Sequence, residues 1–139
     1  MKGVYVLILR LDRPQKLNIG KLGLLTFQSG YYAYVGSALN SLEKRIERHL
    51  RKNKKLHWHI DYLTLKAKPV CVIFAKTEFK MECKIANELS DLESVKGFGC
   101  TDCNCKSHLF YARNLDKLIK NVKEAFVSVG LKPARKDFT

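Results

Sequence analysis

The sequence contains no apolar run long enough to cross a membrane. Its longest apolar stretch, "GVYVLIL", covers only residues 3–9, whereas a membrane-spanning helix needs roughly 20 apolar residues. The stretch follows Met1 and Lys2 directly, without the basic leader and small-residue cleavage site of a secretory signal. We therefore expect a soluble, cytoplasmic protein that has no membrane partner.

Acidic residues are also scarce. The chain has 13 Asp and Glu against 26 Lys and Arg, which gives a formal net charge of +13. So much positive charge repels itself unless the usual partner is anionic. Nucleic acid is the leading expectation, because phosphate contacts supply most non-specific affinity. The alternative is a lysine-rich surface without a specific partner, since charge alone does not identify a function.

The cysteines do not form a disulfide framework. There are five of them, an odd number, and no secretory signal accompanies them, so we expect reduced thiols, metal ligands or core residues. Cys71, in the apolar run "PVCVIFA", is expected in the core. The chain has no internal repeat, and its length of 139 residues predicts a single domain over 1–139.

Three local patterns indicate how the chain folds. Residues 2–11 are apolar on both alternating faces, which is typical of a central strand covered on both sides. The turn signal "QSG" at 28–30 separates two β-rich runs and predicts a hairpin. Asn40, followed three residues later by Glu43, predicts a helix start with a capping box.

These patterns extend along the whole chain. The predicted strands are 2–11, 22–27, 31–36, 68–76 and 108–112; the predicted helices are 41–53, 56–66, 80–93 and 114–130; loops are predicted at 13–21 and 96–107, and a basic C-terminal tail at about 131–139. This order predicts an α/β (α+β) fold in which helices flank a small mixed, mainly antiparallel sheet.

The first predicted helix carries two polar side chains at the border of its apolar stripe. Leu42, Ile46 and Leu50 form that stripe, and Arg45 and His49 lie one turn apart beside it. Such a pair would face the crevice between helix and sheet, although an arginine and a half-buried histidine can also simply complete a core face. The basic residues expected to point away and bind nucleic acid are Lys44, Arg48, Arg51, Lys52, Lys54 and Lys55.

Two tyrosines are placed to join the same crevice. Tyr34 and Gly36 share one face of the strand "YYAYVG" by the period of two. Tyr5 in "GVY" can meet Tyr34 if the first strand is the neighbour. Tyrosine pairs are ordinary in cores, so the meaning of this pair depends on the residues that follow it.

The full series has a specific resemblance. "GVY" at 3–5, "YVGSA" at 34–38 and "LEKRIERH" at 42–49 resemble the GIY-YIG nuclease superfamily, with Val in place of Ile in both named motifs. The motif core covers about 1–55. The segment "GFG..DC.C.SHLF" at 97–110 is similar to an uncharacterised, small single-domain branch of that superfamily.

The resemblance implies a metal-dependent endonuclease built on a central three-stranded sheet with flanking helices. It implies that Tyr5 acts as general base or orients the attacking water, with Tyr34 supporting it. It further implies that Arg45 stabilises charge on the phosphate, that His49 assists proton transfer, and that a glutamate on a later helix holds Mg²⁺ or Mn²⁺. A phenol is a poor base at neutral pH unless cations lower its pKa, which a metal and Arg45 would do.

Glu82 is the expected metal ligand. It opens the third predicted helix directly after a strand, where the resembling branch places its acidic residue. Glu88 and Glu78 are the alternatives, and Glu82 can also serve merely to offset the helix dipole. In "HWHID", His57 or His59 is a further candidate for catalytic assistance.

A zinc site is an alternative for the cysteine-rich loop. Cys100, Cys103, Cys105 and His108 are zinc-ligand types within nine residues. A loop that tight is shorter than the usual two-knuckle arrangement, so it can equally be a structural glycine-rich loop.

A zinc-stabilised interaction domain is one rival function, and a non-catalytic nucleic-acid-binding module on the same scaffold is another. For the nuclease that the resemblance implies, we expect DNA rather than RNA as the substrate, although the residues themselves do not distinguish the two. No separate targeting domain is visible, which favours structure-selective cutting or help from a protein partner, and a homodimer is left open.

Overall fold

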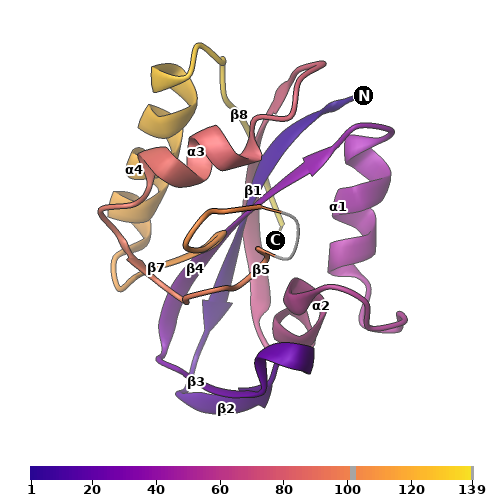
Figure 1. Ribbon diagram of the computed structural model, residues 1–139, viewed down its shortest axis with the longest axis vertical. Coiled ribbons are helices and arrows are strands. Elements are labelled where there is room, and N and C mark those ends of the chain that lie inside the picture. The colour runs from indigo at the N-terminus through magenta and orange to yellow at the C-terminus, as the bar shows by residue number, and fades with distance from the viewer. Residues whose placement is uncertain (101–102, 139) are drawn as a thin grey trace.

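The computed structural model describes residues 1–100 and 103–138, and in them helices flank a mainly antiparallel sheet (Figure 1). The strand order of the six-stranded sheet in this part is β6-β7-β4-β1-β5-β8, and β2 and β3 form a separate two-stranded sheet. The fold class predicted from the sequence is thus confirmed. The elements are β1 (Gly3–Leu11), β2 (Gln15–Asn18), η1 (Gly20–Leu22), β3 (Leu24–Phe27), β4 (Gly30–Ala38), α1 (Leu42–Leu50), α2 (His59–Thr64), β5 (Lys68–Lys76), α3 (Glu82–Glu88), β6 (Glu93–Ser94), β7 (Leu109–Ala112), α4 (Leu115–Ser128) and β8 (Ala134–Asp137).

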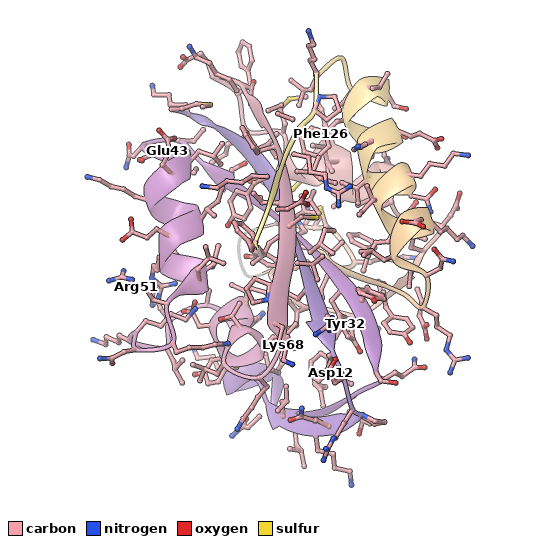
Figure 2. All side chains as sticks on the ribbon, turned by 180° about the vertical axis from the view of Figure 1, so that it is seen from behind. Asp12, Tyr32, Glu43, Arg51, Lys68 and Phe126 are labelled. Atoms are coloured by element: carbon pink, nitrogen blue, oxygen red, sulfur yellow. The ribbon has the colours of Figure 1, made fainter. Side chains whose placement is uncertain are left out.

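β1 is the central strand, as its two apolar faces predict. It pairs antiparallel with β4 on one side and with β5 on the other. Val4, Val6 and Ile8 are buried in the cluster that α3 and α4 cover, whereas Tyr5 and Leu7 are buried in the cluster on the other face. Figure 2 shows the same division from behind, with Phe126 pointing from α4 toward the sheet. Both faces of the sheet therefore carry a hydrophobic core.

The predicted hairpin between 22–27 and 31–36 is wrong. β3 pairs with β2, and β4 pairs with β1 and β7. Both edges of β4 are thus occupied by other strands, so β3 has no edge of β4 to join. The segment 13–21, predicted as a loop, supplies β2 and η1 and buries Leu17 and Ile19.

The helix boundaries shift because different residues provide the caps. Ser41, and not Asn40, caps α1, and its side chain accepts a hydrogen bond from the Lys44 backbone N–H at 3.2 Å. α1 ends at Leu50 because Arg51 adopts an extended conformation. None of the helices in the described part of the chain is long and apolar enough to span a bilayer.

The predicted basic tail at about 131–139 is wrong in part, because it contains a strand. Residues 134–137 form β8, which pairs antiparallel with β5, with Cys71 opposite Asp137 and Phe74 opposite Ala134. The physical reason is that β1 occupies only one edge of β5, and the other edge offers unpaired backbone groups to the returning chain. Thr139, at the end of that predicted tail, lies outside the described residues.

Candidate functional site

Four of the five predicted catalytic residues line one hollow. It has a volume of about 560 Å³ and lies where the β1–β4 pair meets α1, α3 and the loop that leads to β7. In Figure 1 this loop crosses in front of the sheet, between α3 and the α1–α2 pair. Tyr5, Tyr34, Arg45 and Glu82 all line the hollow. Segments far apart in the sequence therefore contribute to a single polar cavity.

Tyr5 reaches the hollow because Gly36 leaves room for its ring. The two residues are opposite each other in the β1–β4 register. A Cβ atom on Gly36 would collide with the Tyr5 hydroxyl and with the ring carbon that carries it. The glycine of the "YVG" motif is thus required here by close approach of a side chain, and its φ is not in the left-handed region.

The Tyr5 hydroxyl is hydrogen-bonded to His49 on α1. The Tyr5 oxygen and His49 Nε2 lie 2.6 Å apart. His49 is only 3% exposed, so it lies behind Tyr5 in the core rather than at the border of the helix face as predicted. Its other ring nitrogen, Nδ1, has no hydrogen-bond partner among residues 1–100 and 103–138.

Burial keeps both partners neutral. Burial, followed by the positive charge of Lys54, lowers the pKa of His49 to about 3, so the imidazole is uncharged at pH 7. Burial also raises the pKa of the Tyr5 phenol well above its ordinary value, and the opposing effect of Arg45 is smaller. Among the chain's own groups, then, the expected lowering of the Tyr5 pKa by cations does not occur. In the tautomer of His49 that carries its proton on Nδ1, the phenol donates this hydrogen bond to Nε2.

Tyr34 packs beside this pair. Its ring centroid lies 6.4 Å from that of Tyr5 and 5.9 Å from that of His49. Burial raises the pKa of the Tyr34 phenol well above its ordinary value. Tyr34 therefore supplies a second protonated phenol to the wall of the hollow.

Ser37 connects Arg45 with Glu82. The Arg45 guanidinium donates a hydrogen bond to the Ser37 backbone oxygen at 3.0 Å, and the Ser37 hydroxyl donates to a carboxylate oxygen of Glu82. The guanidinium also lies 4.5 Å from the centre of the Trp58 ring, which restricts its position. Ser37 was not among the residues predicted for the site, although its place within the "YVGSA" motif was a signal that could have found it.

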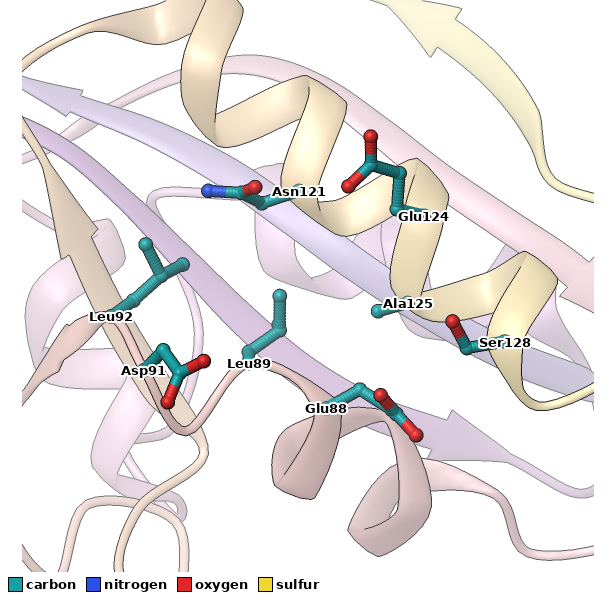
Figure 3. Close-up of a pocket in the computed structure, with 8 residues that line it drawn as sticks. All are labelled: Glu88, Leu89, Asp91, Leu92, Asn121, Glu124, Ala125 and Ser128. Carbon is teal, nitrogen blue, oxygen red and sulfur yellow. The ribbon is translucent and has the colours of Figure 1, made fainter.

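The alternatives to Glu82 lie elsewhere. Glu88, at the end of α3, lines a separate groove of about 130 Å³ between α3 and α4, where it lies near Glu124 and Ser128 (Figure 3). Glu78 is exposed and forms an ion pair with Lys2 at 3.3 Å. Of the three glutamates considered, only Glu82 lines the hollow.

Arg48 is held by the fold rather than directed to solvent. It makes a bidentate contact with Asp61 at 2.7 and 2.9 Å and lies 4.3 Å from the centre of the Trp58 ring. Burial raises the pKa of the fully buried Asp61 carboxyl, and hydrogen bonds from Arg48 and from the Trp58 and His57 backbone more than offset that effect, so the pKa lies below its ordinary value. The pair ties α1 to α2.

Two lysines of the predicted docking surface also turn inward. The Lys54 amino group donates to the His49 carbonyl at 3.0 Å and to the Thr64 hydroxyl at 2.7 Å, while that of Lys52 donates to the Thr64 and Ala67 carbonyls. Burial lowers the pKa of Lys54 to about 8. These donors satisfy carbonyl groups at or just beyond the C-terminal ends of α1 and α2, where the last carbonyls of a helix have no partner within it. The predicted docking residues that are exposed are Lys44, Arg51, Lys55 and, despite the contacts of its amino group, Lys52. Figure 2 shows Arg51 on the outer side of α1.

The two histidines of "HWHID" differ in role. His59 Nδ1 accepts a hydrogen bond from the Gly99 backbone N–H at 2.8 Å, which ties α2 to the loop before β7. His57 lines the hollow and is exposed. Because Asp61 is engaged by Arg48, these three residues do not form a metal site.

The cysteine-rich loop forms a metal-binding cluster with a different fourth member than predicted. Cys83, Cys103, Cys105 and His108 offer ligand atoms that all lie within 4.8 Å of one another, so the cluster can hold a metal ion. Cys83 comes from α3. Cys100, the predicted member, instead directs its thiol to the Phe98 carbonyl at 3.4 Å. A short loop cannot easily surround an ion alone, and a residue from α3 completes this cluster.

Comparison with known proteins identifies a family. Residues 4–131 match the model of a family described as Domain of unknown function DUF123. The chain belongs to the DUF123 family. The comparison with curated proteins gave no match, and neither did the comparison with solved structures.

The DUF123 match includes every residue that lines the hollow and every member of the metal-binding cluster. It begins at Val4, in β1, and ends at Leu131, directly before β8. The two sites thus both belong to the part of the chain that defines the DUF123 family, whereas the edge strand β8 lies beyond it.

Proposed function

We propose that this DUF123 protein is a metal-dependent endonuclease of the GIY-YIG type, which hydrolyses phosphodiester bonds in nucleic acid. The observation that supports this most is the arrangement of Tyr5, Tyr34, Arg45 and Glu82 around one hollow. These residues supply three kinds of group. One is a phenol that has a neutral imidazole as its hydrogen-bond partner; the others are a guanidinium and a carboxylate. Activation of water and neutralisation of a phosphate require such groups.

The Tyr5–His49 pair is suited to accept a proton from water. In the His49 tautomer with its proton on Nδ1, Nε2 accepts the hydrogen bond of the phenol, and the Tyr5 oxygen can then take a proton from the attacking water while its own proton moves to His49. The oxygen of that water forms the new bond to phosphorus, and the bond to the leaving sugar oxygen breaks. Because the pKa of His49 is about 3, its imidazolium gives up the proton at once, and that proton passes through water to the leaving oxygen, which restores the pair.

Arg45 and Glu82 serve the phosphate. The planar Arg45 guanidinium stays charged and can donate two hydrogen bonds to phosphate oxygens. The Glu82 carboxylate and the Ser37 hydroxyl, which lie in contact, offer oxygen ligands. Mg²⁺ and Mn²⁺ prefer oxygen ligands, so this pair fits such a cation. A cation bound there would lower the pKa of water and offset phosphate charge.

The proposed substrate is DNA with a branched or nicked structure, in preference to RNA. The net charge of +13 and the exposed Lys44, Arg51 and Lys55 support binding to a phosphate backbone. A non-catalytic binding module on the same scaffold remains the second proposal, since the same charges would serve it.

A cleavage assay on matched variants tests the proposed function. The protein is incubated with nicked, branched and linear DNA and with structured RNA, with and without Mg²⁺ or Mn²⁺. Glu82→Gln is expected to reduce cleavage by about 100-fold or more, because it removes the carboxylate in the hollow. Glu88→Gln, on the same helix but outside the hollow, is expected to leave cleavage within about twofold of the wild type.

A tyrosine pair gives a second internal control. Tyr5→Phe is expected to abolish most cleavage, whereas Tyr31→Phe is expected to retain it, since Tyr31 packs on the opposite face of β4.

If Glu82→Gln cuts as well as the wild type, Glu82 is not the metal ligand. Salt-dependent binding without cleavage of any substrate would leave the binding module as the function.

A further inference from the structure

The spacing of the Cys83, Cys103, Cys105 and His108 ligand atoms matches a tetrahedral site. His108 Nε2 lies 3.4 Å from the Cys103 sulfur and 3.8 Å from the Cys83 sulfur. With Zn–S of ~2.3 Å and Zn–N of ~2.0 Å, a tetrahedron has nitrogen–sulfur edges of about 3.5 Å. Both nitrogen–sulfur distances thus lie close to the edges that a central ion would impose.

The residues that carry these ligands are held by the fold on several sides. Cys83 is in the first turn of α3. His108 donates its backbone N–H to the Phe98 carbonyl at 2.8 Å, and its carbonyl accepts from Val35 on β4 at 2.9 Å. The position of the imidazole is therefore fixed by the sheet and by the preceding loop. A site that is organised in this way before the ion binds loses little conformational freedom on binding.

We propose that Cys83, Cys103, Cys105 and His108 bind one Zn²⁺ ion in a closed, structural site. Thiolate and imidazole ligands select zinc over Mg²⁺ and Mn²⁺, which prefer oxygen. Four protein ligands fill the tetrahedron and leave no position for water, which is typical of structural rather than catalytic zinc. The five cysteines are unpaired, as a thiolate site requires.

The proposed zinc supports one wall of the hollow. Cys83 directly follows Glu82, and Cys83, Cys103 and His108 themselves line the hollow. The ion would connect the start of α3 with the loop before β7 and so hold the Glu82 carboxylate opposite Ser37. This effect on Glu82 rests on the proposed function, whereas zinc binding itself does not.

Metal analysis of the full chain tests the proposal. The protein is expressed with zinc in the medium, purified under reducing conditions without chelators and measured by mass spectrometry for metal content and free thiols. The expected result is about one zinc per chain, with a thermal midpoint that falls when a strong chelator removes the metal. Absence of zinc, or a disulfide within the cluster that persists in reducing buffer, would overturn the proposal.

A pair of cysteine variants identifies the fourth ligand. Cys83→Ser is expected to lose most of the zinc, whereas Cys100→Ser is expected to keep it, because the Cys100 thiol contacts the Phe98 carbonyl instead. Both thiols are only partly buried, so both serine variants should fold. Cobalt substitution adds a spectroscopic measurement: thiolate-to-cobalt absorption should appear in Cys100→Ser and be lost in Cys83→Ser. The reverse pattern would assign the site to Cys100.

The test separates zinc binding from cleavage. Glu82→Gln is expected to retain full zinc content, because its side chain contributes no ligand to the cluster. Zinc-loaded protein that cuts no nucleic acid would overturn the proposed nuclease and leave the zinc site standing. Cleavage by protein that contains no zinc would overturn the zinc site alone.

Discussion

The hydrogen bond between Tyr5 and His49 joins two side chains that burial keeps neutral. In water a phenol is a poor proton acceptor, and a charged imidazolium cannot accept a proton at all. In the core of this protein the imidazole stays neutral across the whole physiological pH range, and the same low pKa makes it a weak base that must pass any proton on at once. The neutral state of His49 is therefore the residue-level property on which the proposed proton transfer depends.

The same property predicts how stability varies with pH. Since the pKa of His49 is about 3 in the folded protein and ~6.5 in the unfolded chain, only the unfolded chain binds a proton between these values. The contribution of His49 to the free energy of unfolding should be constant above pH ~6.5 and should fall by about 1.4 kcal/mol per pH unit down to pH ~3. Urea unfolding at a series of pH values measures this slope.

His49→Gln provides the control for this slope, because glutamine does not titrate. Its unfolding free energy should decline less steeply than that of the wild type between pH ~6 and pH ~4. Parallel curves for the two proteins would show that His49 is protonated in the folded state, contrary to its burial.

At the scale of elements, α1 and α2 are joined by polar contacts made by basic side chains. Arg48 pairs with Asp61, and Lys52 and Lys54 donate to the carbonyls of α1 and of α2 and the turn that follows it. These contacts explain why half of the basic residues predicted to bind nucleic acid are turned inward. They also fix Trp58, which lies beside both Arg45 and Arg48.

Removal of the Asp61 charge should destabilise this pair of helices. In Asp61→Asn the Arg48 guanidinium loses its anionic partner, and Asp61 is completely buried, so we expect a loss of about 3 kcal/mol in the free energy of unfolding. Glu47→Gln, an exposed change on α1, the helix that carries Arg48, should cost less than about 0.5 kcal/mol. Urea titrations of the two variants make the comparison, and equal stabilities would contradict the role given to Asp61.

On the scale of the whole molecule, the sheet separates two cores and positions the hollow at the edge of one of them. α3 and α4 cover one face, and α1, α2 and the small β2–β3 sheet cover the other (Figure 1). The hollow receives groups from β1, β4, α1, α2 and α3. Its geometry therefore depends on the assembly of the entire fold rather than on any single motif.

The net charge of the molecule predicts a steep dependence of nucleic-acid binding on salt. We expect three single variants to weaken binding: Lys44→Ala, Arg51→Ala and Lys55→Ala. Each should also make the plot of log affinity against log salt concentration less steep, by about 0.9 for each phosphate that the variant no longer neutralises. Lys120→Ala, on the exposed side of α4, should leave the slope unchanged. Fluorescence anisotropy at several salt concentrations measures these slopes. An equal effect of all four variants would indicate binding by overall charge alone.

The sequence by itself determined the central strand and the class of fold, and it pointed to four of the residues that line the hollow: Tyr5, Tyr34, Arg45 and Glu82. Two apolar faces can be read from "GVYVLIL" because burial on both sides leaves no polar position. Glu82 could be chosen for its place at the start of a helix. These features depend on neighbours in sequence and on the period of a strand or helix, which local patterns encode.

Only the tertiary structure decided which strand pairs with which, which basic residues are free and which cysteine completes the metal-binding cluster. The pairing of β3 with β2, the turn of Arg48 toward Asp61 and the replacement of Cys100 by Cys83 all depend on segments that are distant in sequence. Each of these groups had a plausible local alternative: a hairpin, a solvated face, a compact loop. The choice between them rests on which edge, carboxylate or thiol the folded chain brings within reach, and no local pattern records that.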